Sequence, residues 1–230
     1  MWHGYILFRH DGHLGRYSAL IARSRKEGWR VNATDFTVDD ELLEKIAGEL
    51  ALSESPTLDG LFDQRGAPRP LLLFDPTIGE LGESRLMSLM EYWAELPRID
   101  DLPAAARLDP VDIASVLAIV MLLEPVHGKN DYRYLVYGEE IAKRFTRNMV
   151  GALTSEIPIP ANVKALFLGG YLAAIRHRKP LLTEHTAPPT VSVTKWRRLI
   201  LPLAGPDGTV TRILVGNIPG DWRKPVDGAK

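Results

Sequence analysis

The chain is organised around one stretch, Asp131-Tyr-Arg-Tyr-Leu-Val-Tyr-Gly138-Glu-Glu-Ile-Ala-Lys-Arg-Phe145-Thr-Arg-Asn-Met-Val-Gly151. Its first part alternates aromatic and β-branched side chains up to Gly138, and this period of two predicts a strand. Ile141 and Phe145 then recur at helical spacing, so we expect a short helix to begin where the strand ends. A strand that turns directly into short helices leaves its apolar inner face under a helical cover, and this geometry predicts a small pocket.

The other strands and one long helix follow from the same kinds of signal. The apolar run 116–124 and the strand 132–137 predict a hairpin. Residues 162–177 carry a helical apolar stripe, and Pro180 forbids the continuation of that helix. Together these elements predict a five-stranded antiparallel sheet within about residues 114–218, with helices inserted after its second strand. The remaining strands are expected at 181–186, 191–203 and 209–217.

Several segments carry a resemblance to a known family: Leu89–Trp93, Asp109-Pro-Val-Asp-Ile113, Tyr132-Arg-Tyr134, Phe145-Thr-Arg-Asn-Met-Val-Gly151, Tyr171-Leu-Ala-Ala-Ile-Arg176, Lys179-Pro180 and Arg198-Leu-Ile-Leu-Pro-Leu203. Their order and spacing resemble a bacterial PAS-like sensory domain family over about residues 84–220. The chain departs from the family at 146–151, where the family has a Gly-Arg-Asp-Leu-Thr-Gly turn. The resemblance implies an α+β fold with a PAS-like five-stranded antiparallel sheet and inserted helices. It also implies a sensory pocket between the sheet and the short helices.

The part of the chain before this region has the pattern of a small α/β unit. It combines expected strands at 4–8, 29–32 and 71–74 with two helices, the second of which begins after Thr37 as its N-cap. A loop rich in Gly and Pro follows, around residues 53–70. We therefore expect three parts: a small α/β N-terminal region of unknown role at 1–80, a PAS-like sensory domain at 84–220, and a flexible tail at 221–230.

Composition limits the classes of partner and of chemistry. Lys plus Arg is 28 and Asp plus Glu is 29 among 230 residues, so the net charge of −1 argues against a dominant electrostatic partner such as nucleic acid. The absence of cysteine excludes disulfides, thiolate metal sites and a cysteine nucleophile. No signal peptide is recognisable, and the longest apolar run, 113–123, is too short to span a bilayer. We expect a cytoplasmic protein with no membrane partner.

Four aromatic residues are expected to line the pocket. Apolar walls with few polar groups favour a small, mostly apolar ligand, and the Tyr134 hydroxyl is placed to fix its orientation. The sequence names neither the ligand nor a cofactor. A packed core with no ligand is the alternative for each position. The four residues are Tyr134, Phe145, Phe167 and Tyr171.

A second candidate site lies on the helix expected at 86–96. Its apolar side chains fall on one stripe, and Pro97 ends the helix. Exposed apolar stripes often form interfaces, so the stripe predicts a homodimer contact. The alternative is that the helix only covers the sheet. The stripe consists of Leu86, Leu89, Met90 and Trp93.

No catalytic constellation stands out from the sequence. His3, His10 and His13 have side chains that can bind a metal, but their spacing is irregular and crosses an expected turn. Glu184 and His185 are neighbours on an expected strand near the pocket mouth. Adjacent strand residues point to opposite faces, so this pair is poorly placed for joint acid–base work.

Two basic segments, 176–179 and 195–198, are candidates for binding an anionic partner. The second contains Trp196, and a mixture of basic and aromatic side chains is typical of nucleic-acid binding. Basic residues are also favoured at the C-terminus of a helix, where the first segment is expected. Alternate residues of the second segment divide between the two faces of a strand. We therefore rank nucleic acid below an anionic small ligand or an acidic protein partner.

The resemblance implies a PAS-like sensory or signalling protein that binds a small molecule or a protein partner and regulates an output in trans. A ligand-free interaction or dimerisation module is the main alternative. An enzyme that uses the N-terminal α/β unit ranks last, because no catalytic set is visible.

Overall fold

The computed structural model describes residues 36–145, 147–188 and 191–223. The chain divides into two compact units, Met1–Phe36 and Thr37–Lys230. The strands and helix expected before residue 33, and the three N-terminal histidines, lie outside the described residues. All that follows concerns the second unit.

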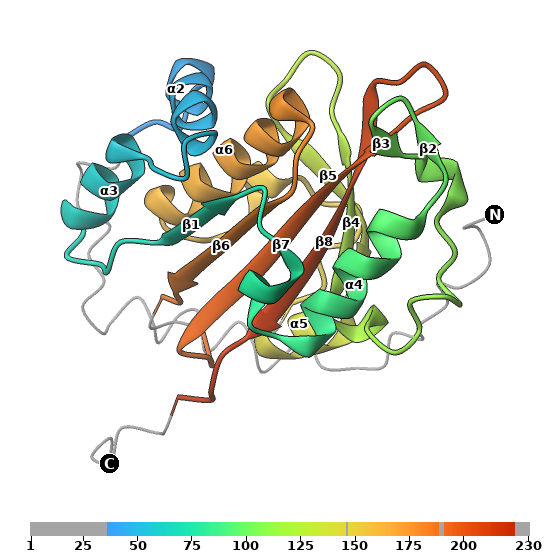
Figure 1. Ribbon diagram of the computed structural model, residues 1–230. Coiled ribbons are helices and arrows are strands. Elements are labelled where there is room, and N and C mark those ends of the chain that lie inside the picture. The colour runs from blue at the N-terminus through green and yellow to red at the C-terminus, as the bar shows by residue number, and fades with distance from the viewer. Residues whose placement is uncertain (1–35, 146, 189–190, 224–230) are drawn as a thin grey trace. The chain divides into compact units, whose positions relative to one another are not determined.

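Six strands form one antiparallel sheet in the order β1-β6-β7-β8-β4-β5, and two short strands form a separate β2-β3 pair. Figure 1 shows the sheet running through the unit with helices on both sides. The strands are β1 (Leu71–Phe74), β2 (Arg98–Ile99), β3 (Leu102–Pro103), β4 (Val120–Pro125), β5 (Tyr132–Tyr137), β6 (Leu181–Thr186), β7 (Lys195–Ala204) and β8 (Val210–Pro219).

The helices occur in two groups along the chain, before β4 and between β5 and β6. The α-helices are α2 (Asp40–Leu50), α3 (Pro56–Asp63), α4 (Ser84–Glu95), α5 (Glu139–Phe145) and α6 (Ala161–His177). Short 3₁₀ helices are η1 (Ile78–Leu81), η2 (Ala105–Arg107), η3 (Leu117–Ile119) and η4 (Thr154–Glu156).

The sheet confirms the α+β prediction and corrects it in one respect. Strands β4 to β8 are the five expected antiparallel strands, and α5 and α6 are inserted after the second of them. The sheet nevertheless has six strands, because β1 pairs antiparallel with β6 and extends that edge. The sequence predicted β1 as a strand but assigned it to a separate N-terminal region.

Gly138 ends β5 for a steric reason. A Cβ atom at this position would lie 2.3 Å from the carbonyl oxygen of Ala118, which belongs to the backbone of η3. Its own N–H donates to the Val120 carbonyl at 2.8 Å. Only glycine allows so close an approach, and the chain then turns directly into α5. The predicted transition from strand to helix is confirmed here.

Residues 37–80 pack onto the same core as the sheet. Helices α2 and α3 both contact α6, and a Cβ atom on Gly169 would lie 2.5 Å from Cγ2 of Ile46. The segment expected as a loop at 53–70 contains α3, which Ser55 caps by accepting from the Leu58 N–H at 3.2 Å. The expected boundary near residue 80 therefore does not separate two compact units.

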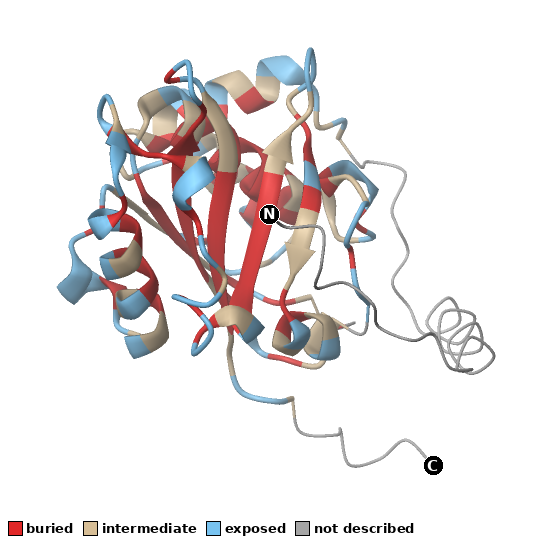
Figure 2. Cartoon of the chain, turned by 90° about the vertical axis from the view of Figure 1, so that its right-hand side faces the viewer, coloured by how far each residue is buried: buried red, intermediate tan, exposed pale blue. Residues whose placement is uncertain are grey.

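Both faces of the sheet are covered. Figure 1 shows α4 on one face and α6, with α2 and α3 beyond it, on the other. Helix α6 lies between the sheet and α2, so it is buried on nearly all sides from Asn162 to Ala174. Figure 2 shows the central strands buried along most of their length. Because both faces are apolar, β7 and β8 carry long buried runs instead of alternating patterns.

The first residues of the expected tail are held in place. Trp222 forms an isolated bridge with Val193, and the Arg144 guanidinium carbon lies 3.9 Å from a Trp222 ring centroid. Arg223 donates from Nε to the carbonyl oxygens of Val193 at 2.9 Å and Val191 at 3.2 Å. Residues 221–223 are thus docked on the domain, which corrects the expected start of the tail.

Candidate ligand site

A cavity of about 30 Å³ lies between the inner face of the sheet, helices α5 and α6, and the loop after β6. Aliphatic and aromatic side chains form most of its wall, and the volume is enough for one or two water molecules. The cavity occupies the place where the sequence predicted a pocket. Its polar wall residues are described below; the others are Met121, Ile141, Phe145, Ile157, Ile159, Val163, Phe167, Pro188, Val191 and Trp196.

Three of the four predicted pocket residues line this cavity, namely Tyr134, Phe145 and Phe167. Tyr171 is fully buried and lies beside the cavity, with its ring 5.1 Å from that of Tyr132 in an edge-on contact. Tyr134 packs edge-on against Tyr137, another lining residue, at 5.3 Å. Burial is the main cause that raises the pKa of Tyr134 well above its usual range, so its hydroxyl keeps its proton near neutral pH.

The charged residue in the wall is Arg198, in the middle of β7. Its side chain is 4 % exposed, and its guanidinium carbon lies 3.5 Å from the centroid of the Phe167 ring. Its Nε and Nη1 atoms are buried and have no hydrogen-bond partner, and no described carboxylate forms an ion pair with it. A guanidinium buried in this way has lost water without gaining an anion.

Two further polar groups face the same cavity with unused hydrogen-bonding atoms. Asn217, on β8, is the strand partner of Arg198, and its Oδ1 has no partner. His185, on β6, contacts Phe167 edge-on at 5.3 Å, and its Nδ1 has no partner. Burial, and to a lesser extent the charge of Arg198, lowers the pKa of His185 to about 3. His185 is therefore neutral near pH 7.

The basic segment 195–198 divides between two environments, as strand alternation requires. Lys195 and Arg197 bind the carboxylate of Glu184 at 3.0 Å and 3.1 Å, and Arg197 also donates to the Glu80 carbonyl at 3.2 Å. Arg198 points to the cavity side and lacks such a partner. The expectation that Glu184 and His185 lie on opposite faces fits this arrangement, because Glu184 binds these two cations and His185 lines the cavity.

The other basic segment is also neutralised. Arg176 pairs with Glu44, Arg178 pairs with Asp101, and Lys179 binds Asp75 at 2.8 Å. His177 lies 3.2 Å through Nε2 from the Ala47 carbonyl oxygen. Neither segment leaves a run of unpaired cations among the described residues.

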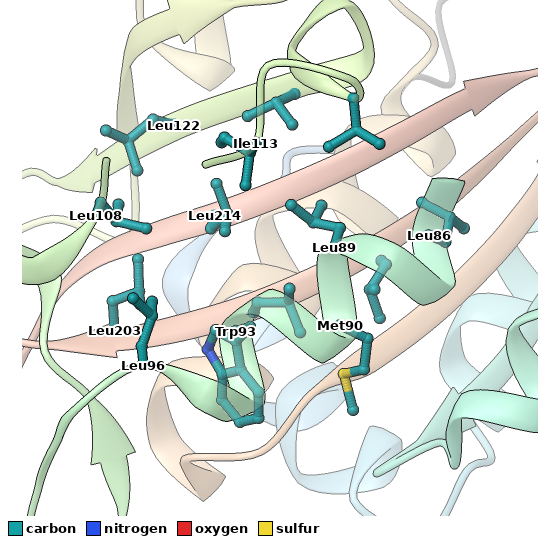
Figure 3. Close-up of a cluster of buried hydrophobic side chains, with 14 of the residues drawn as sticks. Leu86, Leu89, Met90, Trp93, Leu96, Leu108, Ile113, Leu122, Leu203 and Leu214 are labelled. Atoms are coloured by element: carbon teal, nitrogen blue, oxygen red, sulfur yellow. The ribbon is translucent and has the colours of Figure 1, made fainter. Parts of the chain in front are cut away.

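The apolar stripe of α4 packs inside the same chain. Leu86, Leu89, Met90 and Trp93 are all buried within a hydrophobic cluster that includes side chains of β4, β7 and β8. Figure 3 shows Leu89 and Trp93 directed toward this cluster. Trp93 also donates from Nε1 to the carbonyl oxygen of Pro202 at 2.9 Å. These four side chains give a single chain no exposed stripe, so a dimer through α4 would have to use other residues of the helix.

No group of three or more His, Asp or Glu side chains that could hold a metal occurs among the residues that the structure describes. In the same residues, no helix is long and apolar enough to cross a membrane.

Sequence reasoning missed Arg198 and Asn217 as cavity residues. Arg198 stands in the basic segment 195–198, whose residues were expected to divide between two faces of a strand, and it was not assigned to the pocket. A signal was present, however, because Arg198 alternates with the apolar residues Trp196 and Ile200 on one face of the strand, whereas Lys195 and Arg197 lie on the other face. Asn217 gave no comparable signal, since its position follows only from the register between β7 and β8.

Comparisons with known proteins give little further identification. No protein-family model matches the chain, and no curated protein matches it. Among solved structures, it resembles a chain described as "Structure of an RNA-binding Light-Oxygen-Voltage Receptor", with 13 % sequence identity and a TM-score of 0.38. The match covers 76 % of this chain and 48 % of the receptor, so this chain spans about half of that receptor. A TM-score this low carries no argument about fold or partner.

Proposed function

We propose that this protein is a PAS-like sensory module of the cytoplasm, which binds a small molecule in the inner cavity and regulates a partner in trans. The observation that carries the proposal is the cavity itself. It lies between the sheet and the inserted helices, and three of its polar wall residues, His185, Arg198 and Asn217, have buried atoms without hydrogen-bond partners. Buried polar atoms are nearly always paired, so a cluster of unpaired ones favours a binding site over a packed core.

The C-terminal segment offers a physical link between the cavity and an output. Pro188 and Val191 line the cavity, and both belong to the loop that Arg223 contacts. Arg223 also donates to the Ala187 carbonyl. A ligand that displaces Pro188 or Val191 would therefore alter the hydrogen bonds that hold Arg223 on this loop. Through such a change, ligand binding in the cavity could shift the conformation of the C-terminal segment.

Native mass spectrometry of gently purified, full-length protein tests the proposal. We expect a mass excess that disappears when the protein is denatured, or a specific adduct when the protein is mixed with a pool of metabolites. Val163→Phe adds bulk to the cavity wall and should reduce the adduct, whereas Val163→Ile is the conservative control. A chain that shows only its own mass, alone and with the metabolite pool, would contradict ligand binding.

The interaction-module alternative is favoured by a different feature. An open groove of about 810 Å³ lies beside α4 and is lined by four carboxylate residues and one cation, Arg107. This charge balance suits a basic partner surface. Binding of a protein partner that is unaffected by Val163→Phe but lost on Glu91→Lys would support this second function. The acidic residues are Glu91, Glu95, Asp109 and Asp112.

A further inference from the structure

Arg198 carries a buried positive charge that no described carboxylate neutralises. The rings of Phe167, at 3.5 Å, and of Tyr171, at 5.9 Å, attract the cation but supply neither a counter-charge nor an acceptor for its N–H groups. Removing an ion from water costs several kcal/mol even after the protein relaxes. The aromatic contacts alone therefore do not offset the burial of this side chain, and the difference is what an anion in the cavity would supply.

Charge and size define the chemical class of that anion. Arg198 carries the charge among the lining residues, which include no Asp, Glu or Lys. One cation matches a monoanion better than a phosphate dianion, and a carboxylate is a monoanion near neutral pH. Asn217 stands next to Arg198 in the sheet register, and its unpaired Oδ1 is a hydrogen-bond acceptor that suits a water or a hydroxyl group beside the anion.

We infer that the cavity binds a small monocarboxylate, with its carboxylate on the unpaired Nε and Nη1 donors of Arg198 and its apolar end against Ile141, Phe145 and Phe167. This inference rests on the proposed ligand-sensing function and specifies its ligand. It differs from the expectation of a small, mostly apolar ligand that the Tyr134 hydroxyl orients. The cavity of about 30 Å³ has room for little more than the head group, so the apolar chain of the ligand must displace wall side chains.

His185 fits the same arrangement. Its neutral imidazole has an N–H that can donate to a bound carboxylate or to a water beside it. It lies close enough to Arg198 for the two to interact electrostatically, and both contact the ring of Phe167. The three side chains thus lie together in one part of the cavity wall.

Melting temperatures of the full-length protein test the inference. The probes are sodium formate, acetate, propionate and butyrate, with the corresponding neutral amides, sodium chloride and sodium phosphate at matched ionic strength. We expect a concentration-dependent rise for at least one carboxylate and none for its amide or for the two inorganic salts. Arg198→Met should remove this rise and weaken binding by calorimetry roughly tenfold or more.

Matched variants separate charge from folding. Arg197→Gln, one residue away on the paired face, should keep the response, and Arg198→Lys should keep it in weaker form. If either Arg198 variant fails to fold, the comparison of acid with amide in the wild type still decides. The inference is overturned if amides act as strongly as acids, if phosphate acts as strongly as carboxylates, or if folded Arg198→Met responds like the wild type.

The outcomes also separate this inference from the proposed function. A neutral compound that binds wild type and Arg198→Met equally, and is blocked by Val163→Phe, would retain ligand sensing and reject the carboxylate. If no compound of either class binds, the sensing proposal fails together with the inference.

Discussion

The guanidinium carbon of Arg198 lies 3.5 Å from the centroid of the Phe167 ring, and the two side chains meet inside the domain at the wall of a cavity. One comes from the middle of the sheet and the other from the helix that crosses it. The contact therefore ties the sheet to α6 at the point where the polar atoms lack partners. A ligand that binds Arg198 would act on both elements at once.

The coupling between these residues can be measured directly. Phe167→Ala should lower the free energy of unfolding by roughly 3–5 kcal/mol, because it removes a buried ring. Phe167→Leu keeps most of the apolar volume and should cost less. In a double-mutant cycle by urea unfolding, Phe167→Leu and Arg198→Met should show a coupling of about 0.5–2 kcal/mol. Additive effects would mean that the ring does not stabilise the cation.

His185 should make stability depend on pH. Its pKa is lowered to about 3 in the folded protein, from an ordinary value of 6.5. The contribution of His185 to the free energy of unfolding is fully present above about pH 6.5 and is lost as the pH falls. Between the two pKa values, only the unfolded chain takes up the proton. The expected loss approaches roughly 1.4 kcal/mol per pH unit.

Urea unfolding at several pH values between 7 and 4 checks this prediction. His185→Leu removes the titrating group, so its stability should fall less steeply with decreasing pH than that of the wild type. If stability falls equally steeply with decreasing pH in the two proteins, burial does not lower the pKa of His185.

The sequence predicted most of the sheet but not how the outer elements join it. Strand β6 was predicted residue for residue, and the strand-to-helix change at Gly138 was clear because local residues determine it. The pairing of β1 with β6 depends on contacts between distant segments, which no local pattern encodes. Helix α3 was missed although Ser55 and Pro56 are a cap and a first-turn proline, since the surrounding Gly and Pro residues favoured a loop.

The candidate site was predictable in outline for a related reason. Phe167 belongs to an apolar stripe with helical spacing, so its place in the cavity wall could be predicted from the sequence. The burial of Arg198 did not, because an arginine is almost never fully buried without a partner and the default interpretation places it in solvent. The stripe on α4 raises the same difficulty, since an apolar stripe is equally consistent with a core and with an interface.

Substitutions on α4 distinguish these two roles. Leu89 is fully buried, so Leu89→Ala should cost roughly 2–5 kcal/mol in urea unfolding, and Leu89→Glu should prevent folding. The exposed neighbour Glu91 is the control, and Glu91→Ala should change stability by less than about 0.5 kcal/mol. If Leu89→Glu instead yields a folded monomer from a dimeric wild type in light scattering, the interface role is right.

The packing of α2 on α6 tests whether residues 37–80 belong to the same folding unit. Gly169→Ala places a methyl group against the side chain of Ile46, which its Cβ would approach to 2.5 Å. The strain should exceed the gain in helix propensity of about 1 kcal/mol. Ile46→Ala should make room, so the double variant should be more stable than the sum of the single effects by urea unfolding. Strict additivity would mean that α2 does not pack at Gly169.

The central claim is that Arg198 binds the carboxylate of a small molecule inside the domain. Side-chain Nε–H signals of ¹⁵N-arginine-labelled protein report on it directly, with the Arg198 signal assigned by its absence in Arg198→Lys. Titration with propionate should shift this signal in a saturable manner, whereas propionamide should leave it unchanged and the Arg197 signal should respond to neither. An Arg198 signal that stays in place at saturating propionate, or that shifts equally with the amide, would contradict the claim.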